Sequence, residues 1–355
     1  MIARPAVLLL HRWAGLVLGV LVVVICLSGA IAVFRPEIDR LASRPASAAP
    51  RAADLDAIAA RLQSGSPGAR VASLALASAA GEADAWMLRG GREGSWMVFT
   101  DPATGEELGR TRGRWSSMAV AWIARFHHDL WLPPAGGVVV GVGGLALVVF
   151  CLSGLYLCWP GLFRRRLDLH RAAGLAALPV LLFVAVTGTM FEFTWLRRAV
   201  HSVLGGTAAD APMALRNRTE RPRSATAAGP DIGWSAGFAA AAGAVPDGRV
   251  ARLLPPRPDE PNGTWRATLD VPGSLSPNGG AIVQFDRRSA ALLELQDPRR
   301  MSVGGWLLNQ HLGLHTGAWG GPATRLLWVV VGVAPLILLI TGWRLWRRRS
   351  MRASS

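Results

Sequence analysis

This chain of 355 residues is 51% hydrophobic with a positive mean hydropathy, which is typical of a membrane protein with room for additional domains. Its net charge is +15, but no basic helix interleaved with aromatic residues is present, which argues against nucleic-acid binding and favours arginine clusters at a membrane face. The three cysteines lie in apolar runs without a CxxC pair, which excludes a disulfide framework and a cysteine-based zinc site.

The first apolar run covers residues 16–34 and is long enough to cross a hydrocarbon core of about 30 Å. Such a run can also be a signal peptide, with Arg4 and Arg12 as its charged start and small residues at its end as a cleavage site. The motif that opens it, beginning at His11, recurs at His170, where no signal peptide can lie. We therefore interpret the run as a membrane helix.

A more polar stretch follows and predicts a small soluble α+β domain. A short helix is expected over residues 53–62, and strands are expected over residues 71–76, 85–89 and 95–100. The last strand ends in an Asp-Pro-Ala-Thr-Gly turn at residues 101–105.

Two further membrane helices are expected over residues 138–159 and from residue 169 to about residue 195. The cluster Arg164-Arg165-Arg166 lies between them. An amphipathic segment, residues 115–132, precedes them and stops at two prolines. Tryptophans at the ends of these runs fit the aromatic belt of a bilayer interface.

The second polar stretch begins with a linker rich in Pro, Arg, Ala and Gly over residues 205–230. The pattern beyond it resembles that of the first soluble domain, with a helix expected over residues 235–242 and strands over 265–271 and 281–285. A turn at residues 286–289 follows the last of these strands.

An amphipathic segment, residues 304–315, leads to the fourth span, residues 326–346, which Arg347-Arg348-Arg349 closes. With four spans, the start of the chain and both arginine clusters lie on one side, and the positive-inside rule makes that side cytoplasmic. We expect a multi-pass protein of the bacterial inner membrane with both termini in the cytoplasm and both soluble domains in the periplasm.

The predicted fold is a mainly α membrane protein, a bundle of four transmembrane helices built from a duplicated helix–outer domain–helix unit. In chain order, its parts are the first membrane helix (1–36), the first outer domain (37–115), an amphipathic segment with the second membrane helix (116–166), the third membrane helix (167–196), a linker with the second outer domain (197–302), and an amphipathic segment with the fourth membrane helix and a basic tail (303–355).

The first repeated spacing begins at a histidine that opens a membrane helix. His11 is followed by Ser28-Gly29 after 17 residues, and His170 is followed by Thr187-Gly188 after 17 residues. Seventeen residues of helix rise roughly 26 Å. The two histidines are therefore expected near the inner face of the membrane and the two Ser/Thr-Gly pairs near the outer face.

The second repeated spacing begins at a histidine that precedes a returning helix. His127 is followed by Ser153-Gly154 after 26 residues, and His315 is followed by Thr341-Gly342 after 26 residues. Both histidines are therefore expected near the outer face. Of the remaining histidines, His128 and His311 lie next to these motifs without falling on the register, and they are reserve ligands.

The repeat thus predicts an inner histidine pair and an outer histidine pair, each facing two glycines that leave room for a flat macrocycle. Paired imidazoles without a nearby carboxylate or thiolate fit haem iron with two axial histidines, whereas a catalytic zinc site needs a third ligand and an open position. Single histidines at helix ends are often interfacial residues, and Ser/Thr-Gly pairs are common packing devices. Because four histidines follow the repeated spacing, we favour haem-iron ligands over interfacial residues.

Two b-type haems at opposite faces would carry electrons across the bilayer. Arg12 and Arg171 follow the inner histidines and could pair with haem propionates, as Arg125 could at the outer pair. Glu192 is the one acid well inside an apolar run, either a proton or substrate group or a residue at the water interface. No GxGxxG motif follows a strand, so the electron donor is expected to be a separate cytoplasmic flavin-type reductase or a membrane quinol.

These motifs resemble the PepSY-associated transmembrane family of bacterial inner-membrane proteins. The matching stretches are His11-Arg12-Trp13-Ala14-Gly15-Leu16 with Leu27-Ser28-Gly29, Phe126-His127-His128-Asp129-Leu130, Leu169-His170-Arg171-Ala172-Ala173-Gly174, and Leu314-His315-Thr316-Gly317-Ala318-Trp319-Gly320. The outer domains also look like PepSY domains: residues 98–106 are close to the final strand and turn of that domain, and residues 283–289 match less well because they lack its Pro and Gly.

The resemblance implies the activity of the haem-containing ferric-siderophore reductases in this family. These would reduce a ferric siderophore or another Fe(III) chelate in the periplasm, and one electron releases the iron because hard oxygen donors hold Fe(III) more tightly than Fe(II). No catalytic residue beyond the haem ligands is assigned. The alternative is a non-redox PepSY membrane protein that binds or inhibits a periplasmic peptidase or senses a periplasmic ligand, which needs no haem.

Overall fold

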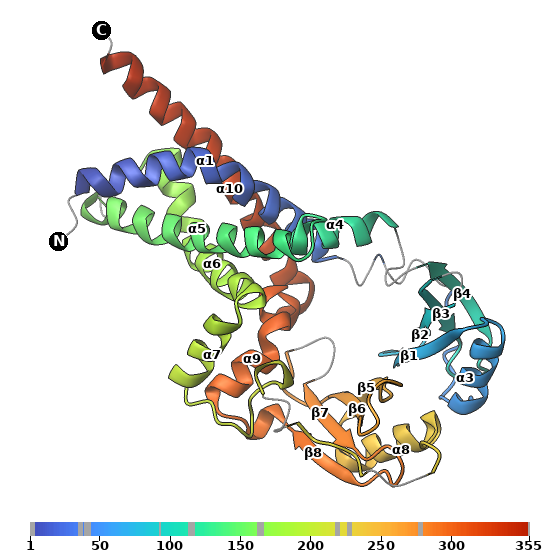
Figure 1. Ribbon diagram of the computed structural model, residues 1–355. Helices are drawn as coiled ribbons and strands as arrows, with labels where there is room; N and C mark the ends of the chain where they lie inside the picture. The colour runs from blue at the N-terminus through green and yellow to red at the C-terminus, as the bar shows by residue number, and fades with distance from the viewer. Residues whose placement is uncertain are drawn as a thin grey trace. The chain divides into compact units, whose positions relative to one another are not determined.

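The computed structural model describes residues 4–34, 38, 44–91, 94–112, 118–161, 167–216, 221–225, 229–275 and 280–353. The chain divides into two compact units (Figure 1), which we call the helical unit (Met1–Arg35, Trp122–Arg197 and Leu314–Ser355) and the sheet unit (Pro36–Ala121 and Arg198–Gly313). The predicted cluster Arg164-Arg165-Arg166 lies outside the described residues.

The helical unit contains the four predicted spans, which are confirmed as helices long and apolar enough to cross a membrane. They are α1 (Arg4–Ala32), α5 (Ala135–Cys158), α6 (Leu169–Glu192) and α10 (Gly321–Ala353). Helix α5 packs against α6, and α1 packs against α10, with further contacts between α1 and α5 and between α6 and α10. The side chains between them are mostly small or aliphatic, such as Val22, Ala177 and Leu181, so the centre of the bundle is apolar.

Shorter helices flank these spans. The third span ends at Glu192, three residues earlier than expected, because Phe193 leaves the helical conformation before a new helix begins. The helices that adjoin the spans in sequence are α4 (Met118–Asp129), α7 (Thr194–Val203) and α9 (Val303–His315), with short 3-10 turns at Trp159–Gly161 and Ala318–Gly320. The sheet unit has further 3-10 turns at Met213–Leu215 and Pro298–Arg300. After α4, both Leu130 (φ 50°) and Trp131 (φ 61°) adopt the left-handed region, so the chain turns sharply.

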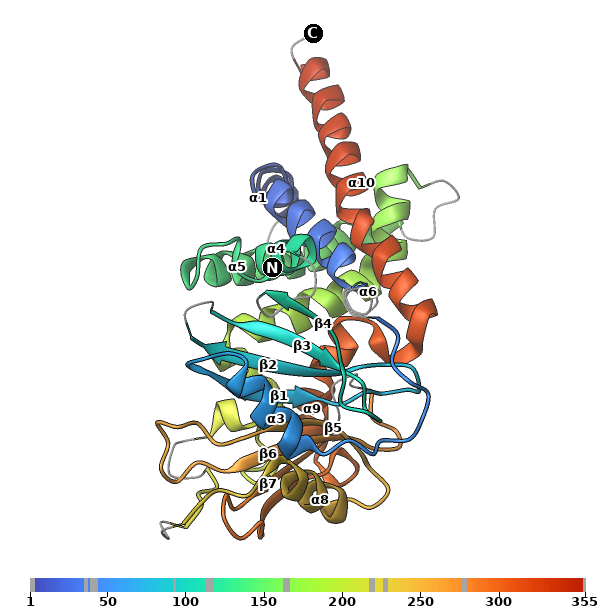
Figure 2. The same ribbon diagram turned by 90° about the vertical axis from the view of Figure 1, so that its right-hand side faces the viewer.

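The sheet unit is built on one antiparallel sheet of eight strands in the order β4-β3-β2-β1-β5-β6-β7-β8, with α3 (Leu55–Ser64) and α8 (Trp234–Ala244) on one of its faces (Figure 2). The strands are β1 (Ala69–Ala75), β2 (Asp84–Gly90), β3 (Trp96–Thr100), β4 (Glu107–Arg112), β5 (Arg249–Leu254), β6 (Trp265–Asp270), β7 (Ala281–Phe285) and β8 (Leu292–Gln296). Each polar segment of the chain therefore supplies one helix and then four strands.

The two polar segments share one sheet and one core. Strand β1 pairs with β5, so that Leu74 lies opposite Leu253. On the helix-covered face, the Trp234 ring contacts those of Trp86 and Trp265, with centroids 5.4 and 5.1 Å apart. The burial of three indoles at the junction ties the halves together through apolar area.

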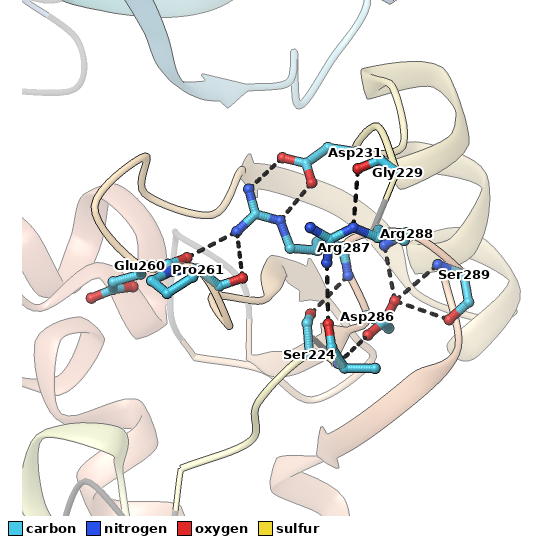
Figure 3. A network of polar contacts seen from close by, with 10 residues as sticks. Ser224, Gly229, Asp231, Glu260, Pro261, Asp286, Arg287, Arg288 and Ser289 are labelled. Carbon is cyan, nitrogen blue, oxygen red and sulfur yellow. Dashed lines mark hydrogen bonds and ion pairs between the residues drawn. The ribbon is translucent and has the colours of Figure 1, made fainter. Parts of the chain in front are cut away.

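A buried aspartate organises the turn between β7 and β8 (Figure 3). The Asp286 carboxylate accepts hydrogen bonds from the backbone N–H groups of Ala225, Arg288 and Ser289, each 2.9 Å long. Arg287 forms a two-point ion pair with Asp231, at 2.5 and 2.6 Å. The network thus fastens the segment before α8 to the end of β7, and Asp101 accepts equivalent backbone bonds in the turn between β3 and β4.

Replacing Asp286 with alanine is expected to destabilise the sheet unit, because three backbone donors lose a charged acceptor. Hydrogen bonds from the backbone of Ser289 and Arg288 hold the pKa of Asp286 well below its ordinary value. A carboxyl with a depressed folded-state pKa stabilises the fold above its unfolded pKa of about 4 and loses this contribution as pH falls further. The difference in thermal midpoint between Asp286→Ala and the unchanged protein should therefore shrink below about pH 4.

The matched control is Asp259→Ala, which removes an exposed carboxylate and should leave the midpoint nearly unchanged. Tryptophan fluorescence during heating measures both variants. Equal midpoints for the two variants at pH 7 would contradict the role given to Asp286.

Candidate functional site

Four of the seven histidines meet as two pairs in the helical unit. The ring centroids of His11 on α1 and His170 on α6 are 6.4 Å apart, and those of His127 on α4 and His315 on α9 are also 6.4 Å apart. The ring planes meet at 87° in the first pair and at 30° in the second. His127 contacts Ile25, near the end of α1, so the pairs are separated by roughly 20 Å along that helix.

Two of these histidines are held by a hydroxyl group of a neighbouring helix. Nδ1 of His11 lies 2.7 Å from Oγ of Ser153, and Nδ1 of His315 lies 3.0 Å from Oγ1 of Thr187. Each hydroxyl donates its own hydrogen to a backbone carbonyl one helical turn earlier, over 2.5 and 2.8 Å. A hydroxyl whose hydrogen is used in this way accepts from Nδ1, so Nδ1 of both rings carries the proton.

Nδ1 of each of the other two histidines lies close to a backbone carbonyl. Nδ1 of His127 lies 2.9 Å from the oxygen of Ile25, and Nδ1 of His170 lies 3.1 Å from the oxygen of Leu338. A carbonyl can only accept, so Nδ1 again carries the proton. The hydroxyls at the predicted positions lie close to the same nitrogens: Ser28 at 3.4 Å from His127 and Thr341 at 3.0 Å from His170.

All four imidazoles are therefore in the tautomer with the proton on Nδ1. In a neutral ring of this kind, Nε2 has the lone pair with which histidine binds a metal. A hydrogen bond from the other nitrogen to a carbonyl or hydroxyl is the arrangement that orients metal-binding histidines. Each ring is thus prepared to offer Nε2 as a ligand.

The predicted glycines lie directly against these rings. The sequence suggested that they leave room for a macrocycle, and in the structure an imidazole occupies the space beside each of them. An added Cβ would meet Cε1 of the adjacent histidine at 2.7 Å (Gly29 and His127), 3.0 Å (Gly188 and His315), 3.3 Å (Gly342 and His170) and 3.5 Å (Gly154 and His11). Each Ser/Thr-Gly pair is therefore a seat for one ring, with the hydroxyl beside Nδ1 and the glycine beside Cε1. A methyl group would crowd the ring at Gly29, Gly188 and Gly342, whereas it would fit at Gly154.

The distance within each pair fits a single metal ion between the two rings. An ion bound by two imidazole nitrogens at about 2 Å each holds the ring centroids about 6 Å apart. Among the described residues, no group of three or more His, Cys, Asp or Glu side chains could hold a metal ion. Two nitrogen ligands without further side-chain ligands suit haem iron, whose remaining four ligands come from the porphyrin.

A cavity of about 260 Å³ adjoins the His11–His170 pair. One water molecule needs only about 15 Å³ measured in this way, so the cavity is far larger than a packing defect. Its lining includes Arg12 and Arg171 beside apolar side chains of all four long helices. Arg171 also pairs with Asp168 over 3.4 Å, whereas no such ion pair to Arg12 occurs among the residues that the structure describes. The lining fits an apolar ring system with acidic substituents.

The remaining predicted site residues lie outside the two pairs. His128 is exposed, and its ring centroid is 5.7 Å from that of His127. His311 is buried one helical turn before His315. Glu192 is half-buried at the end of α6 and packs against α5 where Gly137 leaves room for its carboxylate. Arg125 lies 3.8 Å from Asp129.

The chain was compared with known protein families. The family described as the PepSY-associated TM region matches residues 8–349, nearly the whole chain. The chain belongs to this family. Its four long apolar helices and this membership make it a multi-pass membrane protein of the PepSY-associated transmembrane family. A search of curated proteins finds no match.

One feature of the site was not anticipated from the sequence. The carbonyls of Ile25 and Leu338 each lie three residues before the Ser/Thr of a seat. Each carbonyl accepts a hydrogen bond from Nδ1 of one histidine, Ile25 from His127 and Leu338 from His170. No side-chain pattern marks a backbone acceptor, although the repeated distance of three residues would have located both once the seats were known.

Proposed function

We propose that the protein binds two b-type haems, one at each histidine pair, and carries electrons across the bacterial inner membrane to reduce a ferric siderophore or another Fe(III) chelate in the periplasm. The observation that supports this most is the geometry of the two pairs: equal centroid separations of 6.4 Å, with Nδ1 engaged in every ring. Bound haem supplies one-electron chemistry at each pair.

The residues of the chain have separate tasks in this proposal. His11 and His170 hold one group, His127 and His315 hold the other, and the Ser/Thr-Gly seats keep the four rings in one tautomer. Arg12 and Arg171 would neutralise propionates at the first pair. The centre of the bundle is apolar. We propose that both termini are cytoplasmic and that the donor is a separate flavin-type reductase or a membrane quinol.

We also propose that each helix with its four strands is a PepSY-like domain, so that the chain is a duplicated helix–outer domain–helix unit. The support is the repeated order of elements, α3-β1-β2-β3-β4 and α8-β5-β6-β7-β8, and the equivalent aspartate turns at Asp101 and Asp286.

Absorption spectroscopy of the purified protein tests the function. We expect a Soret band that shifts on reduction and returns to the oxidised position when a ferric siderophore is added. Ferrozine, which binds Fe(II), measures the iron released, and a gallium(III) complex of the same siderophore is the control that accepts no electron. Protein purified from cells with ample haem that shows no Soret band would contradict the proposal and would favour the alternative, a non-redox protein that binds a peptidase or senses a ligand.

A further inference from the structure

The face of the sheet opposite α3 and α8 carries a group of polar side chains at the junction of the two halves. Leu253, Ala267 and Leu269 point into the core under the helices, so their neighbours in sequence lie on the opposite face. In the pairing of β5 with β6, Arg252 lies opposite Thr268, and Arg266 lies two pairs further along, opposite Leu254, on the same face. We call Arg252, Arg266 and Thr268 the arginine cluster.

Arg266 is a half-buried cation without a matching anion. No hydrogen bond or ion pair reaches its guanidinium from any residue that the structure describes. Burial lowers the pKa of Arg266, and the positive charge of Arg257 lowers it further. Because burying an unpaired charge is strongly unfavourable, an arginine in this position indicates a function other than stabilising the ligand-free sheet.

Thr268 adds an unused donor at the same place. Its Oγ1 is buried and has no hydrogen-bond partner in the part of the chain that the structure describes. Thr268 lies opposite Arg252 of β5 on one side and opposite Ile282 of β7 on the other. Buried hydroxyl groups are nearly always hydrogen-bonded, so an acceptor at this position would satisfy it.

No acidic side chain among the described residues pairs with Arg266. On β5 to β8, the two acids of this face are Asp270, which pairs with Arg249, and Glu294, which pairs with Arg216. On the other half of the face, Arg70 lies directly opposite Arg89, although like charges in that arrangement repel. The face therefore has an excess of positive charge that extends from β2 to β6.

We propose that the arginine cluster binds an oxygen-rich anion, with the guanidinium of Arg266 and the hydroxyl of Thr268 donating to its oxygens. This inference rests on the function proposed above in one respect: it identifies the anion as a negatively charged Fe(III) chelate with carboxylate groups. Planar guanidinium groups match carboxylates in a two-point arrangement, and they select against neutral or cationic chelates of the same size.

Gallium(III) citrate tests the binding without any electron transfer, because gallium(III) is not reduced under these conditions. The full-length protein in a non-ionic detergent is titrated by calorimetry. We expect binding that weakens with added salt, and a loss of affinity of about tenfold or more in Arg266→Gln. Arg110→Gln is the matched control, because it removes the same charge from an arginine that pairs with Glu107 on β4, and it should bind like the unchanged protein.

Thermal unfolding shows whether Arg266→Gln is folded. Because the variant removes an unpartnered charge, its midpoint without ligand should equal or exceed that of the unchanged protein. Thr268→Val is the second variant and should also weaken binding. Equal affinity of Arg266→Gln and Arg110→Gln for gallium(III) citrate would overturn the proposal.

Two further titrations identify the ligand. Binding of inorganic phosphate more tightly than gallium(III) citrate, or equal binding of a cationic gallium(III) trihydroxamate, would overturn the assignment to an anionic chelate. The two proposals also fail separately. If the protein contains no haem but binds gallium(III) citrate through Arg266, only the proposed reductase is contradicted. If it is a haem-containing reductase whose affinity for the chelate is unchanged in Arg266→Gln, only the arginine cluster is contradicted.

Discussion

The His170→Ala variant should retain one haem per chain instead of two. Removing one of the two proposed ligands leaves His11 without a partner across the pair, and the pair at His127 and His315 is untouched because it lies roughly 20 Å away along α1. His315→Ala should lose the other haem. Pyridine haemochrome absorbance relative to protein measures the content of each variant, and activity should fall to background in both, since one group cannot connect the two faces.

The control for these variants is His128→Ala. His128 is exposed and adjacent to His127, so its removal tests the effect of losing a histidine close to the site without losing a proposed ligand. It should keep both haems. Retention of both haems in His315→Ala together with loss of one in His311→Ala would show that the register of the repeat had selected the wrong residue on α9.

The Gly29→Ala variant should lose the haem proposed at the His127–His315 pair although neither proposed ligand is changed. The new Cβ would lie 2.7 Å from Cε1 of His127, closer than such contacts occur, so the ring must leave its seat. Displacing a packed ring in this way destabilises a fold by about 1–3 kcal/mol. It also moves Nδ1 away from the carbonyl of Ile25.

Gly154→Ala is the matched control for that variant, because it adds the same methyl group beside His11 at the other pair. There the Cβ would lie 3.5 Å from Cε1, which is an ordinary van der Waals contact, so both haems should remain. Haem content and the Soret maximum of the two variants provide the comparison. Equal haem content in both would contradict the idea that the glycines create space for the imidazoles.

Repeated spacing was the part of the sequence that carried most structural information. Helix geometry converts 17 residues into a fixed rise. His11 and His170 could therefore be placed at one level of the membrane, and the Ser/Thr-Gly pairs at the far ends of the same two helices at the other level. The structure brings together the same residues that these registers grouped. The role of the glycines could not be obtained in this way, because a spacing along one helix does not reveal which atom of a second helix fills the gap.

The sheet was predictable only where its strands are apolar. Residues 71–76, 85–89 and 281–285 alternate or cluster apolar side chains, and the strands expected there are confirmed. Strand β4 (Glu107–Arg112) carries too many polar side chains to be recognised as a strand. Strands β5 (Arg249–Leu254) and β8 (Leu292–Gln296) were also not predicted, although each contains apolar side chains. The pairing of β1 with β5 joins residues about 180 positions apart in the chain, and no local pattern encodes it.

The pairing of equivalent elements has a consequence for symmetry. In the helical unit, each histidine pair consists of the same motif position taken once from each half: His11 with His170, and His127 with His315. In the sheet unit, the first strand of one half pairs antiparallel with the first strand of the other, β1 with β5. Under the proposed duplication, β5 is the counterpart of β1, and their antiparallel pairing would mark a pseudo-two-fold axis, as at the interface of a symmetric homodimer. A chain of half this length would hold only half of each histidine pair, and it could complete both only by associating with a second copy of itself.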